Sequence, residues 1–349
     1  MRGPLELAET GKLPDLLIRL GIRQLNDRRL RDEARGGVEA QQRRLQAFLA
    51  RAARSPIAES PAAANAQHYE VPAAFFRSVL GPHLKYSSAL FPPGVHTLAD
   101  AERAMLDLTA ERAEVRDGMR VLDLGCGWGS FTLFLLQRFP AVQVVAVSNS
   151  HSQREYILAR ARELCVADRL EVVTCDVNQL RLDGNFDRIV SVEMLEHVKN
   201  HDHLFRKLAA HLQPSGKCFF HIFCHRRFAY AFEAEGDDNW MGRHFFTGGS
   251  MPSFDYLLHF QSRWQLERRW AVSGRHYART ASMWLSNLDA RRDQVRDVFR
   301  GVYPELEAER WIQRWRIFFM ACEELWGYRG GDEWLVGHYL FSRSSQLPV

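Results

Sequence analysis

Three ionisable side chains stand close together in the segment SVEMLEHVKN, namely Glu193, Glu196 and His197. They follow the apolar run FDRIVSV, which predicts a buried strand. If the chain turns helical there, Glu193 shares a helix face with the other two, which follow it by three and four residues. Two carboxylates and an imidazole in a cleft can bind a cationic amine and take up its proton, because the pKa of histidine lies near working pH. Taken alone, the pattern fits a helix cap with solvated charges equally well.

A glycine-rich segment, VLDLGCGWGS, predicts where a ligand binds. Its apolar run ends at Gly125, Gly127 and Gly129 and restarts as the helical pattern FTLFLLQRF, which is typical of a strand–turn–helix unit. Such units open nucleotide-binding sheets, whose ligands lie at the carboxyl ends of the strands. Dinucleotide-binding turns carry G-x-G-x-x-G, whereas here the third glycine comes one residue early and Asp123 precedes the first. The segment therefore resembles motif I of class I S-adenosylmethionine (SAM) methyltransferases.

Polar side chains also end the next two predicted strands. Asn149 closes VQVVAVSNS, and Gln153 follows one helical turn later, where an amide can hydrogen-bond the hydroxyls of a ribose. The alternative for Asn149 is a helix cap. Asp176 closes LEVVTCD, and its carboxylate can accept the amino hydrogen of adenine, beside the backbone N–H of Val177, or form a turn. The sequence thus predicts an adenosine site along this edge of the sheet.

The fifth predicted strand, GKCFFHIFCH, carries His221 among phenylalanines. A histidine in such a setting is as often a satisfied core residue as a group that reaches a ligand. His225, His276 and Tyr277 are placed where the edge of the sheet could reach a substrate.

The strands alternate with helices, which is typical of an α/β fold with a doubly wound, mostly parallel sheet of seven strands. Right-handed crossovers then bring the carboxyl ends of the strands to one edge. We expect a Rossmann-like core with an N-terminal helical cap and a lid insertion. Its five parts are a basic helical extension with a linker (1–66), the cap (67–118), the SAM-binding core (119–225), the lid over the active site (226–262) and the rest of the sheet with helices (263–349).

The N-terminal extension is predicted to be helical and basic over residues 13–54, with a break at Gly36 and Gly37. Its leucines form an approximate apolar stripe, which comprises Leu13, Leu16, Leu17, Leu20, Leu25 and Leu30. Interspersed arginines would allow weak contact with an anionic membrane surface. The modest apolar bulk favours the alternative, in which the extension packs on the body of the protein or pairs two subunits as a homodimer. Residues 55–65, rich in Pro and Ala, predict a linker.

The composition is that of an ordinary globular protein, with 46% hydrophobic and 25% charged residues among 349. A net charge of +4 gives no reason to expect a nucleic-acid partner. The six cysteines form no C-x-x-C pair, so no metal site is expected, and they fit a reducing compartment. No apolar N-terminal region and no uninterrupted apolar stretch of about 18 residues is present, so we expect a soluble, cytoplasmic enzyme.

From about residue 67 to 342, the chain resembles the cyclopropane fatty-acid synthase superfamily of SAM enzymes. Within it, the sequence is most similar to the coclaurine N-methyltransferase-like branch. The matching segments are YEVPAAFF, LKYSSALF, AMLDLTAERA, VLDLGCGWGS, SNSHSQREYI, SVEMLEHVKN, FCHRRFAY, HFFTGGSMPS, SGRHYART and EWLVGHYLF. Motif I occurs in many methyltransferases, whereas SVEMLEHVKN together with HFFTGGSMPS is specific for this branch.

The resemblance implies a role for each matching residue. The SAM site would comprise Tyr86, Ser87, Asp123, Gly125, Gly127, Asn149, Gln153, Asp176 and Val177. Glu196 and His197 match the carboxylate–histidine pair assigned to catalysis, and Glu193 matches an acidic residue that holds the substrate amine. The substrate site would further include Tyr69, Glu70, His221, Trp240, Phe245, Phe246 and Tyr277. The aromatic rings of this set can also stabilise a cation.

Two positions depart from the lipid-modifying synthases of this superfamily. Those enzymes usually carry Cys where Ser88 stands and Gly where Glu193 stands, and they hold a bicarbonate. Glu196, His221 and Tyr277 match three positions of that anion pocket, but a carboxylate at Glu193 should repel an anion and favour a cation. The leading expectation is therefore SAM-dependent N-methylation of a small apolar or aromatic amine. Methylation or cyclopropanation of unsaturated acyl chains is the alternative.

Overall fold

A computed structural model describes residues 3–59, 71–233, 235–236 and 239–344 of the protein. Tyr69 and Glu70, both predicted to contact substrate, and most of the predicted linker lie outside the described residues. The described start of that linker is packed on the protein, because Ile57 is buried and Ala58 exchanges two hydrogen bonds with Asn178. This part of the segment is therefore tied to the body instead of acting as a linker.

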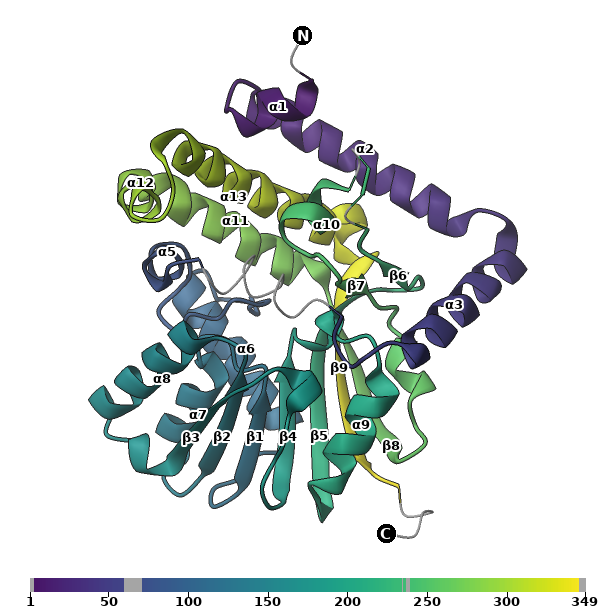
Figure 1. Ribbon diagram of the computed structural model, residues 1–349, viewed down its shortest axis with the longest axis vertical. Helices are drawn as coiled ribbons and strands as arrows, with labels where there is room; N and C mark the ends of the chain where they lie inside the picture. Colours follow the sequence, from purple (N-terminus) through teal and green to yellow (C-terminus); the bar gives the residue numbers. More distant parts are fainter. Residues whose placement is uncertain (1–2, 60–70, 234, 237–238, 345–349) are drawn as a thin grey trace.

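The centre of the fold is a seven-stranded sheet with the order β3-β2-β1-β4-β5-β9-β8. Its strands are β1 (Arg120–Leu124), β2 (Gln143–Ser148), β3 (Leu170–Thr174), β4 (Phe186–Val192), β5 (Leu212–His225), β8 (Trp264–Val272) and β9 (Trp334–Arg343). The first five strands pair in parallel, and β9 runs antiparallel to both β5 and β8. The predicted doubly wound, mostly parallel sheet is confirmed, and the carboxyl ends of β1 to β5 share one edge (Figure 1).

Both faces of the sheet are covered by helices, namely α6 (Leu98–Arg112), α7 (Ser130–Arg138), α8 (His151–Glu163) and α9 (His201–Ala210). Successive strand residues point to opposite faces. Val121 in β1 and Phe219 in β5 therefore pack toward α6 and α7. Their chain neighbours Leu122 and Phe220 pack toward α9. Apolar residues on both sides of each strand explain why the central strands appear as continuous apolar runs in the sequence.

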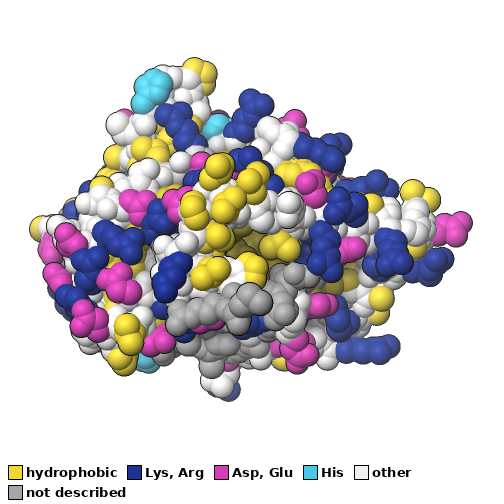
Figure 2. Space-filling model, turned by 90° about the horizontal axis from the view of Figure 1, so that it is seen from above, with side chains coloured by type: hydrophobic (Ala, Val, Ile, Leu, Met, Phe, Trp, Pro, Cys, Tyr) yellow, Lys and Arg dark blue, Asp and Glu magenta, His cyan; other side chains and the backbone are white. Residues whose placement is uncertain are grey.

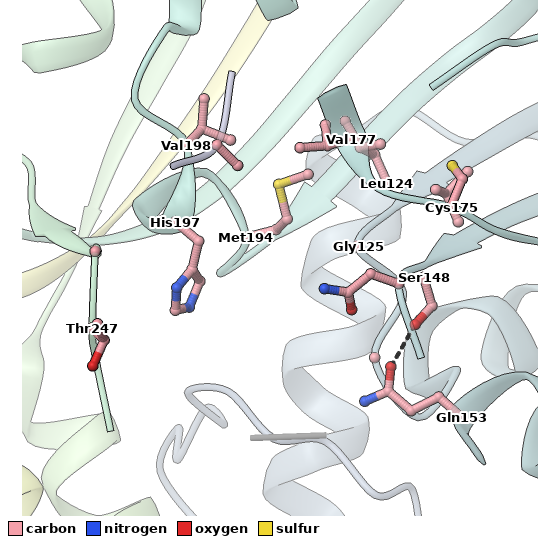
Figure 3. Close-up of a pocket in the computed structure, with 15 residues that line it drawn as sticks. Leu124, Gly125, Ser148, Gln153, Cys175, Val177, Met194, His197, Val198 and Thr247 are labelled. Carbon is pink, nitrogen blue, oxygen red and sulfur yellow. Dashed lines mark hydrogen bonds between the residues drawn. The ribbon is translucent and has the colours of Figure 1, made fainter. Parts of the chain in front are cut away.

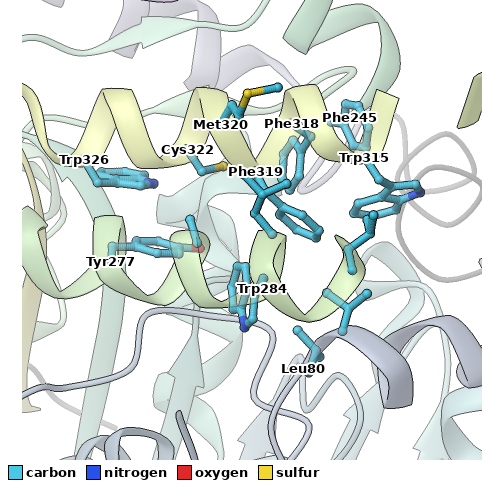
Figure 4. Close-up of a cluster of buried hydrophobic side chains, with 14 of the residues drawn as sticks. Leu80, Phe245, Tyr277, Trp284, Trp315, Phe318, Phe319, Met320, Cys322 and Trp326 are labelled. Carbon is cyan, nitrogen blue, oxygen red and sulfur yellow. The ribbon is translucent and has the colours of Figure 1, made fainter. Parts of the chain in front are cut away.

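Four further helices stand beyond the carboxyl edge of the sheet, namely α5 (Ala73–Val79), α11 (Gly274–Ala290), α12 (Arg292–Arg300) and α13 (Glu305–Trp326). Aromatic side chains fill the space between α11 and α13 (Figure 4). Tyr277 on α11 stacks on Trp326 of α13 with ring centroids 4.8 Å apart. The helix pair therefore forms a rigid aromatic wall above the sheet.

The predicted lid consists of short elements, namely β6 (Tyr230–Ala231), α10 (Trp240–His244) and β7 (Ser250–Met251). Strands β6 and β7 pair with each other in a separate two-stranded sheet. After α10, Phe245 stacks on Phe318 of α13 with ring centroids 4.3 Å apart. The lid is thus anchored on the aromatic wall.

The N-terminal extension forms α1 (Pro4–Glu9), α2 (Asp15–Ala34) and α3 (Gly37–Arg54), and α2 lies across α13 (Figure 1). Arg19 pairs with Glu323 at 2.7 Å and with Glu324 at 2.9 Å, beside the buried Ile18. The predicted apolar stripe is packed only in part, because Leu13 and Leu30 are half-buried against the core. Its members Leu16, Leu17, Leu20 and Leu25 are exposed. On the face seen in Figure 2, hydrophobic side chains gather near the middle, with Lys and Arg side chains around them.

None of the helices in the described part of the chain is long and apolar enough to cross a membrane. Within the same residues, no group of three or more His, Cys, Asp or Glu side chains is arranged to hold a metal ion. All six cysteines are free thiols, four of them buried.

Candidate active site

A cavity lies at the carboxyl ends of β1 and β2, beside the glycine-rich loop (Figure 3). It encloses about 750 Å³ of empty space, part of which is open to solvent. The predicted SAM-site residues in its wall are Gly125, Gly127, Asn149, Gln153 and Val177. We call it the cofactor cavity.

Two glycines of the loop have left-handed backbone conformations that disfavour a side chain. Gly125 has a φ of +80°, and a Cβ atom there would lie 2.5 Å from Met194. Gly127 has a φ of +54° and lines the cofactor cavity, and a Cβ atom there would meet nothing within 4 Å among the described residues. The backbone at Gly127 can therefore be approached closely by a bound group, which a side chain would prevent.

Gln153, near the start of α8, presents its amide to the cofactor cavity (Figure 3). Ser148 Oγ donates a hydrogen bond to Gln153 Oε1 at 2.6 Å, which orients the amide. The Nε2 atom is buried and has no hydrogen-bond partner among the described residues. Because an unpaired buried N–H group is costly, this amide is a donor suited to an acceptor on a ligand, such as a ribose hydroxyl.

The two carboxylates predicted for the SAM site have different surroundings. Asp123 is buried and accepts a hydrogen bond from Thr132 Oγ1 at 2.6 Å, and burial raises its pKa to about 6. Asp176 Oδ1 accepts hydrogen bonds from both N–H groups of Asn178 and caps a short 3-10 helix. The turn-forming role considered for Asp176 is thus present in the structure, while its neighbour Val177 lines the cofactor cavity.

A second cavity adjoins the first and shares Gly125, Gly127, Gln153 and His197 with it. Its wall is rich in aromatic side chains, namely Tyr86, Trp128, Phe131, Phe223, Phe246, Tyr277, Trp284 and Phe318. Its charged side chains are Lys85, Asp123 and Glu193. We call it the acceptor cavity. Because the two cavities share walls, groups bound in them would be neighbours.

Glu193 is held at the wall of the acceptor cavity by three neighbours. Tyr277 Oη donates to its Oε2 at 2.6 Å, and the Ser88 N–H donates to its Oε1 at 2.9 Å. His221 Nε2 lies 3.0 Å from the same Oε1. Burial raises the pKa of Glu193, and the charge of Lys85 opposes this shift, as do the Tyr277 and Ser88 hydrogen bonds. The φ of Glu193 is +48°, a strained conformation of a kind that clusters at functional sites.

Glu196 is more deeply buried and is not part of the described wall of either cavity. Its Oε1 accepts the N–H of Phe223 at 2.6 Å, and its Oε2 has no hydrogen-bond partner among the described residues. Burial, followed by the nearby charge of Glu193, raises the pKa of Glu196 well above its usual range. These surroundings favour the neutral form of Glu196.

His197 lies where the two cavities meet. Its ring lies nearly parallel to that of Phe246 from the lid, with centroids 6.0 Å apart. Burial, followed by the charge of Lys199, lowers the pKa of His197 to about 4, so the imidazole is neutral near pH 7. The helical arrangement considered for this segment is confined to a 3-10 turn over Leu195–His197, and Glu193 precedes that turn in the left-handed conformation.

The other predicted site residues fall into two groups. Tyr86, Ser87, Phe246 and Tyr277 line the acceptor cavity, whereas His221, Trp240 and Phe245 lie outside its described wall. Trp240 Nε1 donates to Glu9 of α1 at 2.8 Å, and Phe245 packs on α13. These two rings therefore anchor the lid in the structure.

Lys85 is a site residue that the sequence analysis does not identify. Its side chain is buried, and its Nζ donates to the Ser88 carbonyl at 2.8 Å and to Ser87 Oγ. Burial lowers its pKa to about 8. Only two of its three ammonium donors have partners among the described residues, so one remains for an anionic group. A lysine inside the apolar segment LKYSSALF is the one sequence feature that could have revealed it.

Comparison with known proteins assigns the family. The model of the mycolic acid cyclopropane synthetase family matches residues 58–332, which is more than half of the chain. The chain belongs to the mycolic acid cyclopropane synthetase family. The match includes the glycine loop, the acceptor cavity and the lid.

Relatives named as N-methyltransferases are similar to this chain, one of them over nearly its whole length. The (S)-coclaurine N-methyltransferase of Thalictrum flavum subsp. glaucum is 35% identical over 343 residues, 97% of this chain and 95% of the relative. The cyclopropane-fatty-acyl-phospholipid synthase of Escherichia coli K12 is 28% identical over 279 residues, 79% of this chain and 67% of the relative. A crystal structure of coclaurine N-methyltransferase with N-methylheliamine and S-adenosylhomocysteine (SAH) superposes with a TM-score of 0.93 at 35% identity, covering 97% of this chain and 98% of that one.

These relatives confirm the resemblance inferred from the motifs, and this member of the mycolic acid cyclopropane synthetase family is a SAM-dependent methyltransferase. The residues present fit that cofactor. Gly127 leaves space at the loop, the Gln153 amide offers an unpaired donor, and Lys85 offers a cation.

Proposed function

We propose that this enzyme transfers the methyl group of SAM to the nitrogen of a small apolar or aromatic amine. The proposal rests on the placement of Glu193, a buried carboxylate in a cavity whose wall contains eight aromatic residues. A carboxylate in such a place attracts a cation, and the faces of aromatic rings stabilise one as well. The acceptor cavity thus suits an ammonium group on an apolar or aromatic body.

The same carboxylate argues against the lipid-modifying alternative. The family resemblance would place His221 and Tyr277 around a bound anion, yet here both contact the carboxylate oxygens of Glu193. Glu193 thereby takes the place that an anion would need, and its charge would repel one. The donors of this pocket serve a fixed carboxylate that faces the acceptor.

For the cofactor, we assign the ribose to Asn149 and Gln153 and the adenine to Asp176 and Val177, because three of these four residues line the cofactor cavity at the ends of β2 and β3. Bound SAM supplies a methyl group made electrophilic by its sulfonium. Tyr86 and Ser87 would hold the methionyl part. We add Lys85 to this set, since its remaining N–H donor suits the methionyl carboxylate.

An amine that binds as an ammonium must lose a proton before its lone pair can attack. We assign the base to His197, because it is neutral near pH 7 and lies where the two cavities meet. The ammonium held by Glu193 gives its proton to His197, and its nitrogen lone pair then forms the new N–C bond while the electrons of the S–C bond remain on sulfur. Glu196, neutral behind the same turn, supports this arrangement through the backbone of Phe223.

The test is methyl transfer from labelled SAM by the purified full chain. The acceptors are a panel of primary, secondary and tertiary amines and, in parallel, vesicles of unsaturated phospholipid. The panel includes coclaurine and heliamine, because relatives are named for the first and hold the N-methylated form of the second. We expect N-methylated product by mass spectrometry and unlabelled lipid. Label in the acyl chains, with none in any amine, would overturn the proposal.

A further inference from the structure

A row of polar side chains crosses the sheet behind Glu193. Backbone register pairs His221 of β5 with His338 of β9, and His338 with Trp270 of β8. Residues paired across neighbouring strands point to the same face of a sheet. The helix α6 covers this face, and its last residue, Arg112, reaches the row.

The row is a continuous hydrogen-bonded chain from Arg112 to Glu193. Arg112 Nη1 lies 2.8 Å from His338 Nδ1, and His338 Nε2 lies 3.0 Å from His221 Nδ1. His221 Nε2 in turn lies 3.0 Å from Glu193 Oε1. Both imidazoles are fully buried, and each of their four ring nitrogens has a hydrogen-bonding partner in this row of side chains.

The direction of every hydrogen bond in this chain follows from its ends. A guanidinium can only donate, so His338 Nδ1 must accept from Arg112 and carry no proton. The proton of His338 is then on Nε2, which donates to His221 Nδ1. His221 must accordingly carry its own proton on Nε2, where it meets a carboxylate oxygen of Glu193. The guanidinium of Arg112 can only donate and the carboxylate of Glu193 accepts. Both ends of the row therefore require the Nε2–H tautomer at His338 and at His221.

The surroundings keep both imidazoles neutral. The charged or titratable groups facing them are Lys85 from the cap, Arg112 from α6, Glu193 after β4 and Tyr277 from α11. Burial, followed by the positive charges of Lys85 and Arg112, lowers the pKa of His221 well below its usual range. Burial and the neighbouring ring do the same for the second histidine. On the outer side, the Arg112 guanidinium lies 4.8 Å over the ring of Trp270, which holds it in place.

We propose that Arg112 and His338 are positioning residues, which fix His221 as the Nε2–H tautomer and so keep Glu193 an ionised carboxylate turned toward the acceptor cavity. This inference rests on the proposed amine methylation for its catalytic consequence. With the opposite tautomer, a lone pair of His221 would face Glu193, and the carboxyl would take up a proton to relieve the repulsion. Arginine retains its protons, so this row of hydrogen bonds ends at a permanent donor. The row therefore does not conduct protons to solvent.

Variants of Arg112 test the proposal without creating a cavity in the hydrophobic core. Arg112→Met keeps an unbranched apolar stem but removes the donor, whereas Arg112→Lys keeps a donor. We expect Arg112→Met to raise KM for the amine about 10-fold, as for a weakened hydrogen bond to a charged group, and to leave SAH affinity within about twofold. Arg112→Lys should recover most of this loss. Arg103→Met is the matched control, because Arg103 lies on the same helix and also stacks on an aromatic ring, Phe134, at 5.2 Å.

A second readout does not depend on turnover. In protein labelled with 15N-histidine and saturated with SAH, long-range 1H–15N spectra distinguish protonated from unprotonated ring nitrogens. In the parent protein we expect the Nε2–H tautomer at both His221 and His338. In Arg112→Met we expect His338 to populate both tautomers instead of the Nε2–H tautomer alone. An Nδ1–H tautomer at either ring, or an unchanged amine KM in Arg112→Met, would overturn the proposal. If the spectra show the expected tautomers but the protein methylates no amine, the positioning of Glu193 by this row is supported. Only the proposed function would then be overturned.

Discussion

At Glu193 and Glu196, two carboxyl groups three residues apart meet different surroundings. Glu193 has three hydrogen-bonding neighbours and a lysine nearby, whereas Glu196 is contacted by one backbone N–H group and faces the charge of Glu193. Environments of this kind give neighbouring carboxyl groups different protonation states and different roles. The member with more hydrogen-bonding neighbours, Glu193, is the one that faces the acceptor cavity.

Glu193→Gln tests whether that charge selects the substrate. We expect KM for the amine to rise at least about 10-fold, because the amide keeps the shape but loses the charge, while the Kd of SAH measured by calorimetry stays nearly unchanged. Glu102→Gln is the control, since Glu102 is also a buried carboxylate but accepts its hydrogen bonds from the backbone of the cap, at Gly81 and His83 among others, and lies outside both cavity walls. Equal losses of amine and SAH binding in Glu193→Gln would contradict the assigned role.

Gly127→Ala tests the approach of the cofactor to the glycine loop. A left-handed φ at an alanine should lower the free energy of unfolding by about 1 kcal/mol, and the added methyl group should also weaken SAH binding. Gly118→Ala is the matched control, because Gly118 has a φ of +77° and open space at its Cβ position but lies outside both cavity walls. Thermal melts should show similar destabilisation of the two variants, and calorimetry should show a loss of SAH affinity in Gly127→Ala alone. Normal SAH binding by Gly127→Ala would remove the loop from the cofactor site.

Residue types and spacing lead to the glycine loop, Gln153 and Glu193, because each follows a recognisable strand. Lys85 and His338 could not be identified as site residues in this way. Lys85 is buried only because the cap folds onto the sheet, which no local pattern reports. His338 meets His221 through the register of two antiparallel strands whose residues are 117 positions apart in the chain.

At the level of elements, the long strands and helices of the core follow from apolar periodicity, as the sheet shows. The position of the lid in the sequence could be predicted, but its secondary structure could not, because β6, α10 and β7 are too short to carry a periodic pattern. The orientation of α2 could not be predicted from its leucines. Arg19 meets two acidic residues of α13 that lie about 300 positions away in the chain, a pairing that no local pattern reports.

One contact between elements joins the extension to the lid. Glu9, buried at the end of α1, accepts a hydrogen bond from Trp240 Nε1 at 2.8 Å and pairs with Arg314 of α13 at 3.0 Å. His244 of α10 lies 3.6 Å from the same carboxylate. A single side chain thus links α1, the lid helix and the aromatic wall.

Glu9→Gln should loosen that link, because the amide can still accept from Trp240 but loses its charge toward Arg314 and His244. We expect faster hydrogen–deuterium exchange over α10 and a KM for the amine raised about threefold, with little change in SAH affinity. The control is Glu39→Gln on α3, where the carboxylate is exposed and its ion pair with Arg43 spans 3.9 Å. Unchanged exchange in α10 would show that the lid does not depend on α1.

For the whole molecule, buried histidines set the response to acid. Burial lowers the pKa of several of them, to about 4 at His197, His201 and His244 and to about 3 at His225. An unfolded chain protonates histidine near pH 6.5. Between there and about pH 4 the unfolded state therefore binds more protons, and stability falls as the pH falls.

Buried carboxyl groups act in the opposite direction, because burial raises the pKa of Glu102 to about 7 and of Asp123 to about 6, and also raises the pKa of Glu193 and of Glu196. The buried histidines outnumber these four groups, because the pKa of His221 and of His338 is lowered as well. We therefore expect the Tm to fall between pH 6.5 and 4.5 in circular dichroism melts. His244→Gln should flatten this dependence, since one of the groups no longer titrates. A Tm that is constant or higher at pH 4.5 would contradict the balance.

The last strand along the chain is an inner strand of the sheet. β9 inserts between β5 and β8 and brings His338 to the back of His221. Strands β1 to β4 and the glycine loop come from one continuous earlier stretch. During synthesis on the ribosome, the cofactor half can assemble first, while β5 keeps an open edge until the final residues emerge. A chain truncated before β9 would therefore lack the support behind Glu193, the carboxylate that we propose binds the amine, and we expect such a chain to methylate amines poorly.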